Sequence, residues 1–125
     1  MESEFGKKIK FKEGDPCMIK PSKVVFISDD LERSFHALSD DDPIKKSIVR
    51  AIKDLKENAF SGIQIPKRLF PKEYAQTYDI KNLWKYDLPK GWRLIYTITA
   101  EDEVQLISAI LEWFDHKSYE RRFGY

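Results

Sequence analysis

The residues best suited to proton transfer lie close together near the end of the chain. His116 is one of two histidines, and an imidazole can donate or accept a proton near neutral pH. Tyr119 follows three residues later, so the two side chains share one face if this segment is helical. For His116 the alternative to catalysis is capping or packing at a strand end. Tyr119 either acts on a substrate or packs the tail onto the fold, and His36, beside Phe35 on an expected helix, is predicted to be structural.

Arginines in the same half of the chain suit the binding of phosphate. Arg93 stands in the segment 92–98, which is otherwise apolar except for Thr97, and a charge without a partner would be costly to bury there. Its guanidinium either forms an ion pair with Asp87 or Glu112, or projects into a polar groove and holds phosphate through two hydrogen bonds. We favour the groove. Arg121, one of a terminal basic pair, is then a candidate to complete a phosphate clamp with Arg93.

Basic and aromatic residues alternate through the middle of the chain. Between residues 64 and 93 there are seven basic residues and three acids, and five tyrosines and tryptophans lie among them. Lys81 and Lys85 are secondary candidates for a binding role, although a solvated lysine on an exposed strand explains either one as well. Asp87 suits the role of a carboxylate base or of a turn residue.

The composition argues against several other kinds of site. Cys17 is the only cysteine, so no internal disulfide or cysteine-based metal site is expected, and a reducing cytoplasmic location is favoured. The sequence shows no metal-ligand cluster, no glycine-rich phosphate loop and no Ser–His–Asp arrangement. No metal or small-molecule cofactor is therefore expected. The net charge is only +1, so a nucleic-acid site must come from local clustering of basic residues. The sequence contains no signal-peptide pattern and no apolar stretch long enough to span a membrane.

The pattern of apolar residues predicts one domain over residues 23–125, preceded by an N-terminal extension over residues 1–22. A β-branched run at 23–28 predicts a strand. Asp29 and Asp30 are expected to cap a short helix, and Asp42 with Pro43 is expected to start a longer one that ends near Asn58. Residues 61–82 are less regular, with a single helical turn expected between Pro71 and residue 78.

Three closely spaced strands are predicted next, at residues 83–88, 92–99 and 104–113, followed by a short helix or tight tail ending at Gly124. Strands this close in sequence can pair only as an antiparallel meander. The expected fold is therefore α+β, with a small antiparallel sheet packed on an N-terminal helical hairpin in the order β-α-α-β-β-β. The helical hairpin is expected to cover one face of the sheet and to leave the other face open for a functional site.

Two segments resemble the RelE/ParE toxin superfamily. Residues 82–96, NLWKYDLPKGWRLIY, look like the second strand, hairpin and third strand of that family, including an arginine before an aliphatic pair and a tyrosine. Residues 111–122, LEWFDHKSYERR, resemble the end of the last strand and the tail, where several branches place active-site residues. The resemblance covers residues 23–125 in element order and 82–122 in residue pattern, and it favours function over packing for His116.

The resemblance implies a metal-independent endoribonuclease that cuts mRNA, often on the ribosome, and that a cognate antitoxin silences. The ribose 2′-oxygen attacks the adjacent phosphate and expels the 5′-oxygen, which requires a base, an acid and cations. The implied catalytic residues are His116, Arg93, Tyr119 and Arg121, and the implied RNA-binding residues are Lys81, Lys85 and Arg122. The alternatives are a ParE-like toxin that inhibits a protein such as gyrase without cutting anything, and an inactive family member kept as an interaction module.

Overall fold

A computed structural model describes residues 20–124 of the chain. Most of the expected N-terminal extension, residues 1–19, lies outside the described residues, and Ser22 at its end already begins the first strand. The elements follow in the order β1 (Ser22–Phe26), α2 (Asp29–Ala37), α3 (Pro43–Glu57), β2 (Ile63–Gln64), η1 (Lys67–Leu69), α4 (Lys72–Thr77), β3 (Trp84–Asp87), η2 (Pro89–Gly91), β4 (Arg93–Ala100), β5 (Leu106–Phe114) and α5 (His116–Phe123).

The strands form one mixed sheet in the order β1-β5-β4-β3-β2. The predicted antiparallel meander of β3, β4 and β5 is confirmed. The prediction of a wholly antiparallel sheet is wrong, because β1 pairs with β5 in parallel, with Ser22 opposite Leu106. No short turn joins these two strands. The long path through both helices and the other strands therefore leaves β1 free to run in either direction. The α+β class is as expected.

Local capping explains where the first two helices begin. The Ser28 hydroxyl, and not Asp29 or Asp30 as expected, accepts a hydrogen bond from the Leu31 N–H and caps α2. Both aspartates lie in the first turn, where negative charge is favourable. The expected start of α3 is confirmed, because an Asp42 carboxylate oxygen lies 2.9 Å from the backbone nitrogen of Ile44.

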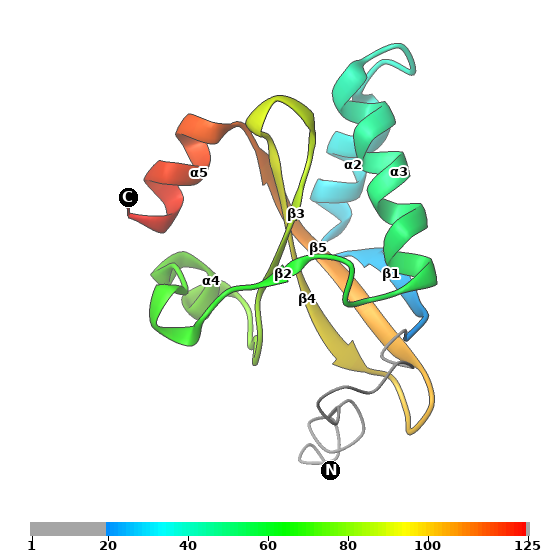
Figure 1. The fold of residues 1–125 in the computed structure, drawn as a ribbon, viewed down its shortest axis with the longest axis vertical. Coiled ribbons are helices and arrows are strands. Elements are labelled where there is room, and N and C mark those ends of the chain that lie inside the picture. Colours follow the sequence, from blue (N-terminus) through cyan, green and yellow to red (C-terminus); the bar gives the residue numbers. More distant parts are fainter. Residues whose placement is uncertain (1–19, 125) are drawn as a thin grey trace.

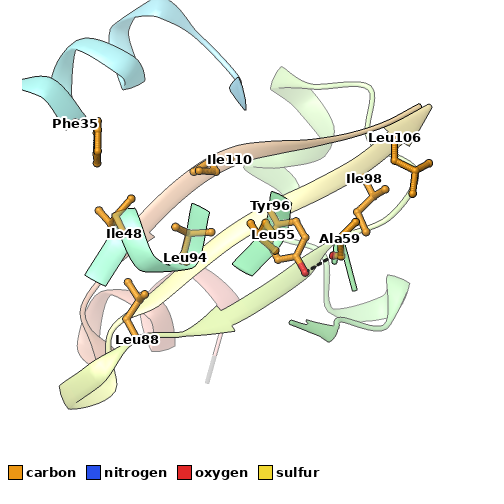
Figure 2. Packing of buried hydrophobic residues seen from close by; sticks show 11 residues of the cluster. Phe35, Ile48, Leu55, Ala59, Leu88, Leu94, Tyr96, Ile98, Leu106 and Ile110 are labelled. Atoms are coloured by element: carbon orange, nitrogen blue, oxygen red, sulfur yellow. Dashed lines mark hydrogen bonds between the residues drawn. The ribbon is translucent and has the colours of Figure 1, made fainter. Parts of the chain in front are cut away.

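Helices α2 and α3 pack on one face of the sheet and form the first core (Figure 1). Ile48 and Leu55 of α3 are fully buried and meet Leu94 and Tyr96 of β4, as Figure 2 shows. The Tyr96 hydroxyl donates a hydrogen bond of 2.8 Å to the carbonyl oxygen of Ala59. The three tryptophans, Trp84, Trp92 and Trp113, are partly buried against this core, to which their large rings add apolar area.

The second face of the sheet is covered as well, so the expectation that it stays open is wrong. In Figure 1, α4 and α5 lie on the opposite side of the sheet from α2 and α3. Strand β4 is apolar on both faces: Leu94 belongs to the first core and Ile95 to the second, and both are fully buried. The second core consists of Ile65, Tyr74, Leu83, Ile95, Leu111, Tyr119 and Phe123.

The long connection between α3 and β3 supplies part of that cover. It contains α4, close to the expected helical turn, and the short strand β2, which the sequence analysis did not predict. Gly62 allows β2 to approach the sheet, because a Cβ atom at this position would overlap the Lys85 carbonyl oxygen and lie 2.8 Å from the Tyr96 hydroxyl. None of the helices within residues 20–124 is long and apolar enough to cross a membrane.

Candidate functional site

One end of the second sheet face gathers several of the predicted site residues. Strands β3 and β4 are joined by a tight turn, and Asp87 stands opposite Arg93 across them, with Lys85 opposite Ile95. Since side chains alternate along a strand, Lys85, Asp87 and Arg93 share the face that carries Ile95 and the second core. Helix α5 begins next to this turn. We call the group formed by Lys85, Asp87, Arg93, His116 and Tyr119 the hairpin-end site.

Arg93 pairs with an acid, which is the first of the two roles considered for it. Its Nε lies 3.1 Å from Oδ1 of Asp87, and its side chain is 18% exposed. The Nε–H group is buried and makes no hydrogen bond within residues 20–124, so the contact with Asp87 is an ion pair without a directed hydrogen bond. The guanidinium Nη1 donates to the carbonyl oxygen of Trp92 at 3.2 Å.

Tyr119 is a core residue, and two cations contact its ring. Its exposed fraction is 4%, and its ring centre lies 4.7 Å from that of Phe123. The packing role considered for it is therefore present in the fold. The Lys85 ammonium lies 5.6 Å from the ring centre, and the Arg93 guanidinium carbon lies 5.3 Å from it. The ring attracts both cations and so holds two positive groups in one place.

His116 is the first residue of α5 and is exposed. Asp115 caps this helix through a 2.8 Å hydrogen bond from the Ser118 N–H, which holds the pKa of that carboxyl below its usual range. His116 is thus not the capping residue. Its Nε2 lies 3.1 Å from Oε2 of Glu120, one turn further along α5, and its side chain is 56% exposed.

The turn between β3 and β4 lies against the side chain of His116. Gly91 has a φ of +82°, and a Cβ atom placed there would lie 3.3 Å from Cβ of His116. The imidazole therefore belongs to the end of the hairpin where Asp87 pairs with Arg93. A glycine at this point allows the start of α5 to pack closely against the turn.

Arg122 is engaged in a network of its own. Its Nε and Nη2 donate to the two carboxylate oxygens of Glu112 at 3.1 and 2.9 Å, and Nη1 lies 3.4 Å from Glu73. The Tyr74 hydroxyl also donates to Glu112, at 2.5 Å. Burial and then this carboxylate raise the pKa of Tyr74 far above its usual range. Burial lowers the pKa of Arg122, but the neighbouring acid Glu112 outweighs it and raises that pKa overall. The network ties α4, β5 and α5 together.

The other two predicted basic residues lie apart from the hairpin-end site. An α-helix turns by about 200° over two residues, so Arg121 faces away from the sheet on which Tyr119 packs, and it is exposed. Its Nη2 donates to the Ser118 hydroxyl at 3.3 Å, and no contact joins it to Arg93 in the described part of the chain. Lys81 is exposed and precedes β3, at the end of that strand away from the turn.

Two further residues, which no sequence pattern singled out above, contact members of this site. Glu120 pairs with His116, and Gly91 sets the closeness of α5 to the hairpin. The spacing of four between His116 and Glu120 is the usual spacing of ion pairs on a helix, so the predicted helical tail contained this signal. The contact with Gly91 joins segments from different elements, and no local pattern reveals it.

The hairpin-end site combines groups that can bind an anion with a group that can transfer a proton. Lys85 and Arg93 are the cations, His116 is the exposed imidazole, and Asp87 is a carboxylate with a side chain that is 53% exposed. Between residues 20 and 124, no three His, Cys, Asp or Glu side chains gather as a metal ion would require. Comparison with known proteins found no matching family model, no similar curated protein and no similar solved structure.

Proposed function

We propose that this protein is a RelE-like toxin, a metal-independent endoribonuclease that cuts mRNA. The observation that carries the proposal is the meeting of Lys85 and Arg93 on one aromatic ring, at the end of the sheet where α5 presents His116. The order of a strand, two helices, an antiparallel meander and a terminal helix, together with the residue resemblance over 82–122, supports a RelE-like topology.

In the proposed reaction, the ribose 2′-oxygen attacks the neighbouring phosphorus and the bond to the 5′-oxygen breaks. The products are a 2′,3′-cyclic phosphate and a free 5′-hydroxyl, so the proton lost by the 2′-hydroxyl is balanced by the one gained at the leaving oxygen. Lys85 and Arg93 offset the charge that builds on the phosphoryl oxygens. His116 and Asp87 are the groups at this site that exchange protons.

This proposal assigns partners and a place of action. The substrate is mRNA, free or on the ribosome, in the cytoplasm, and the neutralising partner is a cognate antitoxin. An antitoxin segment that lies over the hairpin-end site would cover Arg93 and His116 and so block access of RNA. Protection mapping of such a complex is expected to show reduced solvent access between residues 83 and 122.

The first prediction concerns His116. We expect wild-type protein in a translation extract to cut mRNA, and we expect His116→Ala to lower the cleavage rate by about 10²–10⁴-fold, the usual contribution of a positioned acid or base. His36→Ala is the matched control. His36 is also exposed and pairs with an acid four positions away on its helix, Glu32, at 3.6 Å, but it lies on the other side of the sheet.

The cleavage rate and the circular dichroism spectrum are measured for both variants. The comparison is valid only if the spectrum of His116→Ala shows the wild-type fold. Equal loss of cleavage in the two histidine variants, or full activity in His116→Ala, would contradict the assignment. A naked RNA substrate in parallel shows whether cutting needs the ribosome.

A second candidate function rests on the pairing of the charged residues. Arg93, His116 and Arg122 each lie beside an acid, namely Asp87, Glu120 and Glu112. Such pairing suits a surface that recognises a protein, as in a ParE-like toxin that inhibits gyrase without cutting RNA. If the wild-type protein leaves mRNA intact while it inhibits DNA supercoiling, this candidate replaces the nuclease. Inactivity in both assays favours the inactive interaction module.

A further inference from the structure

A groove of about 450 Å³ lies between the segment that contains η1 and α4 and the last turn of α5. We call it the α4–α5 groove. Its apolar part is formed by Leu69, Phe70, Pro71 and Phe123, and its basic part by Arg68, Lys72, Arg121 and Arg122. Gln76 and a single acid, Glu73, also line it. The groove is separate from the hairpin-end site but shares helix α5 with it.

The basic residues of the groove are mostly uncompensated. Arg122 is held by Glu112 and Glu73, the only acid among the lining residues. Arg68, Lys72 and Arg121 are exposed, and within residues 20–124 none of them lies in an ion pair with an acid. These three cations come from η1, α4 and α5, and they line the groove together with four apolar residues. The groove therefore favours an extended polyanion that also presents flat apolar groups.

We propose that the α4–α5 groove binds single-stranded RNA next to the bond that the hairpin-end site cleaves. Phosphates of the strand meet Arg68, Lys72 and Arg121, and a base packs on the half-buried ring of Phe70. An acidic peptide would satisfy the cations equally well. RNA is favoured because α5 carries both His116 and Arg121, five residues or about 7.5 Å apart along the helix axis.

This inference rests on the proposed nuclease function, because the preference for RNA over an acidic peptide depends on His116 lying on the same helix as Arg121. It also gives a role to the long connection between α3 and β3. That connection supplies η1 and α4, and with them Arg68 and Lys72. The groove then determines how tightly flanking nucleotides are held, while the chemical step stays at the hairpin-end site.

The test compares two variants, each lacking two cations. Arg68→Ala/Lys72→Ala removes charge from the groove, whereas Lys53→Ala/Lys56→Ala removes equal charge from the exposed side of α3, on the other side of the sheet. The probe is a fluorescein-labelled oligoribonucleotide with 2′-O-methyl groups, which cannot be cut. Fluorescence anisotropy at several salt concentrations gives the affinity and its salt dependence.

We expect the groove variant to bind the probe roughly tenfold more weakly than wild type. The slope of log affinity against log salt should fall by about 1.4, because each phosphate contact on a single strand contributes roughly 0.7. The α3 variant should match wild type in its affinity for the probe and in the salt dependence of that affinity. With a cleavable RNA, KM of the groove variant should rise while kcat stays close to the wild-type value.

Two results overturn the inference and separate its failure from that of the proposed function. If wild type cuts RNA but the groove and α3 variants bind the probe equally, the groove inference is wrong and the nuclease proposal stands. If wild type neither cuts nor binds RNA, both are wrong. In that second case, poly-glutamate is tested as a probe. If it binds wild type and binds the Arg68→Ala/Lys72→Ala variant more weakly, the groove is assigned to an acidic protein partner instead.

Discussion

At the scale of single residues, the second sheet face is held together by a carboxylate that serves two elements. Glu112 accepts hydrogen bonds from Arg122 of α5 and from Tyr74 of α4. The side chains of Glu112 and Arg122 are each only 30% exposed. Loss of the carboxylate therefore leaves the Tyr74 hydroxyl without its acceptor and the Arg122 guanidinium with Glu73 alone, in a poorly solvated place.

We predict that Glu112→Ala lowers the free energy of unfolding by about 1–3 kcal/mol. Glu57→Ala, at the exposed end of α3, is the control and should change stability by less than about 0.5 kcal/mol. Urea unfolding followed by circular dichroism measures both. A Glu112 variant as stable as the control would mean that the network contributes nothing to the attachment of α4 and α5.

At the scale of elements, capping residues set where α3 and α5 begin, and the apolar residues that follow pack on the sheet. Asp42 caps α3, whose Ile48 and Leu55 belong to the first core. In α5, the cap at Asp115 makes His116 the first helical residue and places Tyr119 one turn later against the sheet.

Removal of the Asp42 side chain tests how much the cap of α3 contributes to stability. Asp42→Ala should lower the free energy of unfolding by about 1 kcal/mol, because the Ile44 N–H loses its acceptor. Asp41→Ala removes an equal charge one residue earlier at an exposed position outside the helix and should leave stability nearly unchanged. Thermal unfolding of the two variants side by side provides the measurement, and an equal loss in both would point to charge rather than to capping.

At the scale of the whole molecule, strand β4 lies between two cores. Leu94 and Ile95 are adjacent and both fully buried, yet they belong to opposite faces of the sheet. The helices on each face are thus joined through the same strand. A defect in either core should consequently weaken the entire sheet rather than one layer of it.

We predict that Leu94→Ala and Ile95→Ala each lower the free energy of unfolding by about 2–5 kcal/mol. Each variant should still unfold in a single transition. Far-ultraviolet circular dichroism reports on the helices and strands together, and tryptophan fluorescence reports on the first core, so the two transitions should coincide. Two separate transitions in Ile95→Ala would show instead that α4 and α5 form an independent layer.

The sequence by itself determined the local elements, because capping and periodicity act over a few residues. The pair of Asp42 and Pro43 marked the start of α3, and the close spacing of residues 83–113 required an antiparallel meander. It also selected His116, Arg93, Tyr119 and Lys85, which the fold places at one end of the sheet.

Only the tertiary structure decided how distant segments meet, because those contacts depend on packing that no short pattern encodes. The parallel pairing of β1 with β5, the cover of the second face by α4 and α5, and the separation of Arg121 from Arg93 all belong to this class. So does the partner of Arg93: the sequence allowed an ion pair or a phosphate groove, and the register of β3 with β4 placed Asp87 opposite it.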